Sequence, residues 1–167
     1  MNYATIRDKI YGDLLAVSGI GKVFKQPRFS ADWATFLSMF TTTNPHDASK
    51  KVVNVAWITR RAFTEADAGK GSRDEAEAIT AVQRDETWEV TVIYGFDDDE
   101  TNPSEADFQP LVDAVAAKFR MMDQAGLPAT VEESWPMQLE AAGLFLFGEV
   151  LCHKAVLTIR IQQRITS

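Results

Sequence analysis

The sequence has 167 residues, of which 46% are hydrophobic and 25% are charged. This composition predicts one globular domain with a real hydrophobic core. The formal net charge is −7, and no run of Lys and Arg is longer than two residues. Proteins that grip nucleic-acid phosphates need clustered basic residues, so sequence-independent nucleic-acid binding is not expected.

The chain shows no segment typical of membrane or secreted proteins. No apolar run approaches the roughly 20 residues that cross a bilayer. Residues 1–15 mix charges into their apolar positions and lack the core of a signal peptide. A single cysteine, Cys152, excludes an internal disulfide and suits a reducing compartment. We therefore expect a protein made in the cytoplasm that does not bind membranes.

The N-terminal third predicts helices and strands in alternation. Residues 3–17 place apolar side chains at helical spacing and predict an amphipathic helix, and residues 22–26 predict a minor strand. A short helix is expected over residues 30–40, with Ser30 as its N-cap. Residues 51–61 are rich in β-branched side chains, which favours a strand.

A long polar stretch follows, from about residue 64 to residue 86. It contains few large apolar side chains, and Ile79 and Val82 are the ones able to anchor it. Structureless loops longer than about 12 to 15 residues are uncommon in compact domains and are usually functional or flexible. We predict a contact arm here, with a disordered surface loop as the equal alternative.

Residues 86–122 are expected to form the centre of the core. Residues 86–96 alternate between apolar and polar positions, which predicts a strand with one buried face. After the acidic turn 97–103, apolar residues recur at helical spacing up to Met122. Ser104 is predicted as the N-cap of this helix. The strand and the helix then bury their apolar sides against each other.

The C-terminal part predicts three more strands. Residues 130–135 suit a short strand, and residues 143–152 are apolar on both faces and predict a buried strand with a bend at Gly148. Residues 154–164 alternate cleanly. The whole pattern predicts an α+β domain over residues 1–167: a mostly antiparallel sheet of about four to five strands with two main helices packed on one face.

One face of this predicted sheet is left uncovered by its two helices. That face must then meet water or a neighbouring subunit. Ile93 and Val156 lie among its polar side chains, which favours a subunit.

Motif tests give no phosphate-binding or calcium-binding loop. The segments around Gly21 and Lys70 fail the P-loop pattern. An EF-hand loop counted from Asp97 places Asn102 and Phe108 where glycine and glutamate are required. A solvated turn whose charge faces the following helix is favoured over an irregular cation site.

Histidine and cysteine chemistry is equally unsupported. Cys152 and His153 are neighbours, so on a strand they point to opposite faces and cannot pair as nucleophile and base. No serine nucleophile elbow is present. We therefore expect no catalytic, cofactor-binding or metal-binding residues, and not an enzyme.

The order of elements resembles the tail-terminator (tail-completion) proteins of tailed bacteriophages. The resemblance covers most of the chain: the N-terminal helix, VVNVAWITRR, the polar excursion, TWEVTVIYGF with its acidic turn, and GEVLCHKAVLTIRIQ. It includes a helix of the form S-E-x-x-F-x-x-L-x-D-x-V, which here runs from Ser104 to Val115.

The resemblance implies a structural virion protein of the tail and neck, assembled in the host cytoplasm. Its homohexameric ring would cap the tail tube, stop polymerisation of the tail tube protein and join the tail to the head–neck connector protein. DNA would pass through the lumen without specific binding, and an acidic lumen would suit this passage.

Two groups of charged residues are the candidates for ring or tube contacts. They are Glu65, Arg73 and Arg84 on the arm, and Asp97, Asp98, Asp99 and Glu100 in the acidic turn. Two alternatives remain open. One is another neck or tail component, such as a head–tail joining protein or a tube subunit. The other is a small bacterial ligand-binding or enzymatic α+β domain, which would carry a deep pocket.

Overall fold

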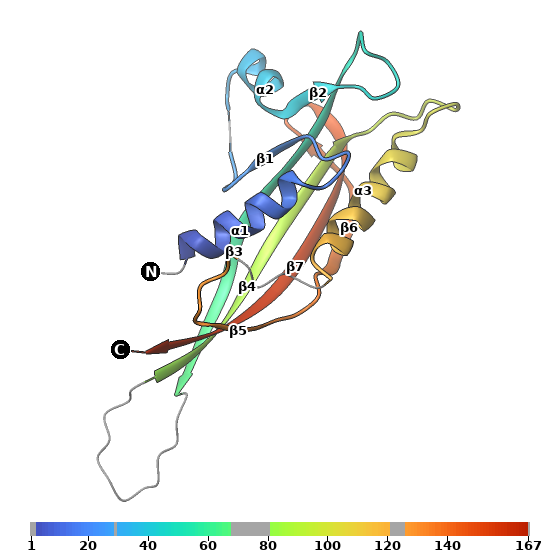
Figure 1. Cartoon of the computed structure of the whole chain (residues 1–167). Coiled ribbons are helices and arrows are strands. Elements are labelled where there is room, and N and C mark those ends of the chain that lie inside the picture. Colours follow the sequence, from blue (N-terminus) through green and yellow to red (C-terminus); the bar gives the residue numbers. More distant parts are fainter. Residues whose placement is uncertain (1–2, 29, 68–80, 121–125, 167) are drawn as a thin grey trace, which may run out of the picture.

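The computed structural model describes residues 3–28, 30–67, 81–120 and 126–166 (Figure 1). This part of the chain forms three helices and one mixed sheet of seven strands. The helices and strands are, in chain order, α1 (Tyr3–Leu15), β1 (Lys22–Phe24), α2 (Trp33–Phe40), β2 (Thr41–Thr43), β3 (Lys51–Asp67), β4 (Ala81–Gly95), α3 (Ser104–Lys118), β5 (Val131–Ser134), β6 (Gln138–Phe147) and β7 (Val150–Thr166).

Three long antiparallel strands, β3, β4 and β7, form the centre of the sheet. The described strands follow the order β1-β3-β4-β7-β5, while β2 joins β3 and β6 joins β7. β1 runs parallel to β3. β5 and β6 divide the outer edge of β7 between them, because each is much shorter than β7.

The main core lies between the sheet and two helices, α1 and α3, on one face (Figure 1). Alternation along β4 and β7 sends every second side chain to this face, and i, i+4 spacing along α1 supplies the opposing layer. The largest fully buried side chains of this core are Ile6, Ile10, Leu14, Ile58, Trp88, Phe108, Phe119, Leu157, Ile159 and Ile161.

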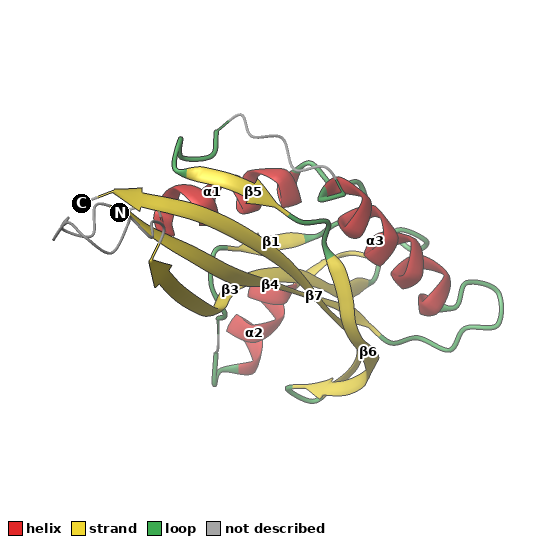
Figure 2. Ribbon diagram, turned by 90° about the horizontal axis from the view of Figure 1, so that it is seen from below, coloured by secondary structure: helices red, strands yellow, loops and turns green. Residues whose placement is uncertain are grey.

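The second face of the sheet is covered at one end by α2, on the side opposite to α1 and α3 (Figure 2). Phe36 and Phe40 of α2 contact Phe147, with ring centroids 4.8 Å and 4.9 Å apart. Ile93 is fully buried in this cluster. Its presence on the polar face is therefore explained within one chain.

The predicted sheet of four to five strands with two helices is wrong in both numbers. The sheet has seven strands, because β1 and β2, of three residues each, and β6 also join it. Three helices pack on it, and they divide between both faces. The expectation that one face is left to water or a subunit took no account of α2.

Several boundaries also differ from the predictions. Gly148 adopts φ of 64° in a turn, so the predicted strand 143–152 is divided into the end of β6 and the start of β7. β6 is mostly exposed, not buried. Asp32, not Ser30, caps α2 by accepting a 2.7 Å hydrogen bond from the Thr35 backbone N–H. Within the predicted loop 64–86, residues 64–67 continue β3 and residues 81–86 belong to β4.

Other predictions are confirmed. β1 and β5 form where minor strands were expected, and β7 buries the predicted inward side chains. Cys152 and His153 lie on opposite faces, Cys152 in the α2 cluster and His153 beside α3. In the described ranges, no helix combines the length and the apolar character needed to span a membrane.

β1 is held against β3 by the side chain of Asn54. Its Oδ1 accepts a 2.9 Å hydrogen bond from the Gly21 N–H, and its Nδ2 donates at 2.9 Å to the Gly19 carbonyl. A Cβ at Gly21 would lie 2.1 Å from the Asn54 carbonyl oxygen, well inside van der Waals contact. This close backbone approach requires glycine.

The substitution Gly21→Ala is expected to lower the free energy of unfolding by at least about 2 kcal/mol, since β1 must move away from β3 and lose both hydrogen bonds. The matched control is Gly12→Ala in α1, where a Cβ meets nothing within 4 Å. That change should stabilise the protein by roughly 0.5–1 kcal/mol. Urea unfolding of both variants tests this, and equal effects would contradict it.

Candidate assembly surface

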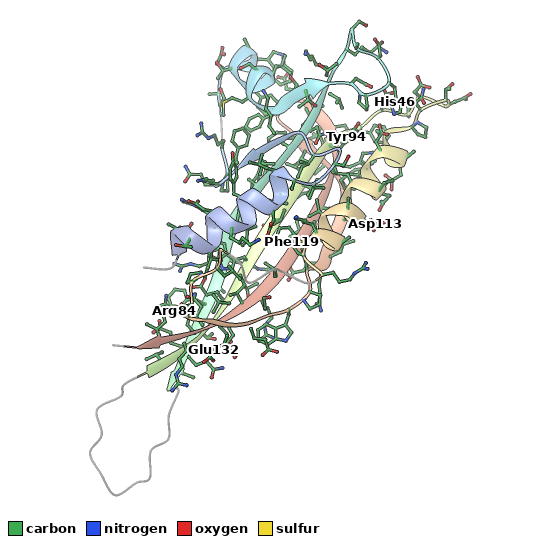
Figure 3. All side chains as sticks on the ribbon, viewed as in Figure 1. His46, Arg84, Tyr94, Asp113, Phe119 and Glu132 are labelled. Atoms are coloured by element: carbon green, nitrogen blue, oxygen red, sulfur yellow. The ribbon has the colours of Figure 1, made fainter. Side chains whose placement is uncertain are left out.

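The charged residues predicted at contacts lie in two groups at opposite ends of the sheet. Glu65 and Arg84 belong to the paired ends of β3 and β4, whereas the acidic turn 97–100 follows the other end of β4. Gly95 follows Arg84 by eleven positions along β4, so the two residues lie about 36 Å apart at the usual rise per residue. Figure 3 shows Arg84 and Tyr94 far apart along β4. Arg73 lies outside the described residues.

At the first end, the charged side chains bind one another. Arg84 Nε donates a 2.8 Å hydrogen bond to Glu65 Oε1. The guanidinium groups of Arg60 and Arg84 each lie 5.0 Å from the centroid of the Phe63 ring. These contacts stiffen the paired ends of β3 and β4, and the described charges there are engaged with one another.

A buried carboxylate, Glu86, lies at the centre of this group. It is 1% exposed and accepts a 2.8 Å hydrogen bond from Trp88 Nε1. Arg60 and Arg84 place nitrogen atoms 3.5 Å and 3.7 Å from Glu86 Oε1. Tyr3 of α1 stacks on Trp88 with ring centroids 5.1 Å apart, so the cluster also fastens α1 to the sheet.

The substitution Glu86→Ala is expected to cost about 2–4 kcal/mol of unfolding free energy, because it leaves two arginines and a buried indole N–H without their acceptor. Glu65→Ala is the matched control. Its side chain is 42% exposed, and loss of such a surface ion pair typically costs less than about 1 kcal/mol. Chemical denaturation measures both, and a Glu65 effect as large as that of Glu86 would contradict the assignment.

At the other end, the acidic turn is built by its own side chains. Asp99 Oδ1 accepts hydrogen bonds from the backbone N–H groups of Thr101 at 2.8 Å and Asn102 at 3.2 Å. These hydrogen bonds lower the pKa of Asp99. Within the described part of the chain, residues 97–100 form no ion pair. Among the described residues, no ion pair therefore neutralises their negative charge.

Two buried residues, Ser104 and His153, form a cluster with the exposed Glu105 and fix this turn to the sheet. Ser104 Oγ lies 2.8 Å from both the N and the O of the Asp97 backbone, and 2.9 Å from His153 Nε2. His153 Nδ1 lies 3.0 Å from Glu105 Oε2. Ser104 is the first residue of α3, and Pro103 occupies the N-cap without a side-chain hydrogen bond. The predicted capping role of Ser104 is wrong, because its hydroxyl binds the turn instead.

The Ser104–His153–Glu105 connectivity has the order of a nucleophile, a base and an acid. However, Ser104 is only 4% exposed, and its oxygen already has three polar neighbours. A hydroxyl with one hydrogen and two lone pairs is then saturated. We interpret the cluster as a clamp on the acidic turn. No pattern in the sequence indicates this cluster, since His153 is 49 residues away from Ser104.

Because His153 is buried in this clamp, we expect the free energy of unfolding to fall in mild acid. Burial lowers the pKa of His153 below its ordinary value near 6.5, against the weaker opposing effect of the Glu105 carboxylate. The unfolded chain therefore binds a proton at higher pH than the folded chain does. The resulting stability is present above about pH 6.5 and is lost as the pH falls from there toward the folded-state pKa.

Denaturant midpoints measured between pH 8 and pH 5 test this expectation. With His153→Asn, the denaturant midpoint should fall less between pH 8 and pH 5. His46→Gln leaves the clamp intact, so its midpoint should fall as much as that of the unsubstituted protein. If the His153 variant shows the same decline as the unsubstituted protein, the clamp does not cause it.

A hollow of about 540 Å³ lies between the loop after α1, β2 and α3. Two of its polar side chains, Tyr94 and Asp107, are bound to each other. Asp107 accepts a 3.0 Å hydrogen bond from the Tyr94 hydroxyl and lies 2.9 Å from His46 Nε2, so it ties α3 to the segment before β3 (Figure 3). Burial and Asp107 raise the pKa of Tyr94. Across the described residues, no group of three His, Cys, Asp or Glu side chains is arranged to hold a metal ion.

Beside the acidic turn lies a patch of exposed apolar side chains, which we term the tip patch: Phe96, Leu144, Leu146 and Leu151, exposed by 37%, 54%, 68% and 40%. Leu146 and Leu151 are cross-strand partners, and the Phe96 N–H donates a 2.9 Å hydrogen bond to the Leu151 carbonyl. Leu144 and Phe96 border one hollow of about 500 Å³ together with the acidic residues 97–100. The four side chains therefore form one continuous surface.

The tip patch adjoins an open strand edge. In the described part of the sheet, β6 pairs with β7 alone. Figure 2 shows β6 at the border of the sheet, curving away from α1 and α3 toward the side where α2 lies. Contiguous apolar surface and an unpaired edge strand are both features that proteins cover with a partner. Neither a scan of protein-family models nor a search of curated proteins finds a match for this chain.

Proposed function

We propose that this protein is a structural virion component, a tail terminator whose ring caps the tail tube, stops its polymerisation and meets the head–neck connector. The observation that carries the proposal is the tip patch beside the open edge of β6. Four neighbouring apolar side chains in water are unfavourable unless another protein covers them. An acidic rim around an apolar centre is the usual anatomy of such an interface.

The internal polar clusters support a scaffold role. Asp107, Glu86 and Ser104 are each bound by two or more groups of the same chain, and each joins elements that are distant in sequence. Groups used in this way hold elements together and do not converge on a substrate. The order of the elements, which resembles that of tail terminators, supplies the more specific part of the proposal.

Two alternatives are distinguished by their own consequences. A tube subunit would polymerise into tubes without any other protein. A ligand-binding domain would remain a monomer and bind a small molecule in the hollow between β2 and α3, which measures about 540 Å³. Asp107 in that hollow is already bound by Tyr94 and His46, which argues against the second alternative.

The proposal is tested with the purified full-length chain. We expect a closed assembly, six copies of the 18.6 kDa chain or about 112 kDa by light scattering if the hexamer holds. Added to growing tubes of a phage tail tube protein, the chain should stop elongation and form a cap visible by electron microscopy. Tubes formed by the chain alone, or unchanged tube growth, would contradict the proposal.

A further inference from the structure

The two borders of the sheet carry opposite charge. Residues 97–107, beside the tip patch, contain six acidic residues and no Lys or Arg. Residues 20–28, which include β1, contain three basic residues and no Asp or Glu. β1 lies at one border of the sheet, and α3 with the acidic turn lies toward the other (Figure 1).

The basic border is also hollowed. A groove of about 350 Å³ is lined by Arg7, Tyr11, Val23, Phe24, Lys25 and Arg28, with Gln26 beside them. The Lys25 ammonium lies 5.0 Å from the centre of the Tyr11 ring, and the Arg28 guanidinium lies 5.4 Å from the centre of the Phe24 ring. The groove thus combines aromatic walls with three cationic side chains. Asp8 forms ion pairs with two of them, Lys25 at 3.0 Å and Arg7 at 3.3 Å, so the groove keeps a smaller net positive charge. An aromatic groove with a net positive rim complements an apolar patch with an acidic rim.

A symmetric contact between two tip patches is disfavoured. It would bring two acidic turns together, and like charges placed face to face cost several kcal/mol. The patch therefore needs a partner with positive charge. The groove beside β1 provides that charge on the same polypeptide.

On these grounds we infer that the tip patch and acidic turn of one copy dock into the basic groove beside β1 of a second copy of this chain. The contact is head-to-tail, because it joins two different surfaces. The pair then keeps one free tip patch and one free groove, so the contact repeats, and it closes into a ring where the rotation allows. This inference rests on the proposed function and adds the two surfaces that meet.

Charge-reversed variants test the contact. Asp98 and Glu100 are exposed and make no ion pair in the described structure, so Asp98→Lys with Glu100→Lys should fold normally. Lys25→Glu with Arg28→Glu reverses the groove. Each double variant alone should raise the concentration needed for half-assembly at least ~10-fold, measured by sedimentation and light scattering.

An equimolar mixture of the two double variants should assemble again. In the mixture, each positive tip meets a negative groove and each negative tip meets a positive groove. A single chain carrying all four substitutions should assemble as well. Glu132→Lys with Glu133→Lys on β5 is the matched control, since it changes net charge by the same amount at exposed positions near the other end of β7 and should leave assembly intact.

This contact would be overturned if both double variants assembled at the same concentration as the unsubstituted chain. It would also be overturned if the mixture and the four-site variant failed to assemble. A monomeric unsubstituted chain, or a control pair that is equally disruptive, would overturn it too. The tube-capping experiment is independent of these outcomes. A ring that forms through this contact but does not cap tubes would refute the proposed function and leave the contact standing.

Discussion

The pairing of β4 with β7 is the constraint on which the rest of the structure depends. It runs without a break from Ala81 opposite Thr166 to Gly95 opposite Cys152. Because side chains alternate along a strand, this register assigns every residue of both strands to one face or the other. A slip of β7 by one residue against β4 would move Leu157, Ile159 and Ile161 out of the core together.

The two faces created by this pairing are covered differently. α1 and α3 bury the first face along much of its length, with the Glu86 cluster closing one end and the Ser104 clamp the other. α2 covers one end of the second face. Near the middle of the second face, Arg61 and Glu140 form an ion pair, and both sit where the strand register shifts at a bulge. Bulges re-aim side chains, which here brings residues of β3 and β6 together across the intervening strands.

Charge is used in opposite ways at the two ends of the molecule. Around Glu86, cations and carboxylates are interleaved within one chain, so that end is electrostatically satisfied. Around the acidic turn, the carboxylates are held by backbone N–H groups, which fix their positions without cancelling their charge. A rigid, unpaired charge next to exposed apolar surface is pre-organised for a partner, because little ordering entropy remains to be lost on binding.

The sequence by itself determined the local structure. Period-two alternation identified β4 and β7 with their buried faces, and helical spacing identified α1 and α3, because these patterns depend on neighbours within a few residues. The sequence also located the acidic turn, and counting positions from Asp97 showed that it does not match a calcium-binding loop. The predicted strand number and helix placement were wrong, since β2 contains too few residues to show a period and α2 packs on the second face.

Only the tertiary structure decided which of these residues meet. In the folded chain, His153 binds Ser104, and Glu86 lies between two arginines. The turn at Gly148 forms a hairpin in which Leu146 and Leu151 lie opposite each other and are exposed. None of these contacts has a sequence signature, because each links residues through sheet order and not through spacing along the chain. The side chains of the tip patch show this most clearly. They look like core residues in the sequence, yet they are exposed because β6 lies at the edge of the sheet, where no further strand or helix of the described chain covers them.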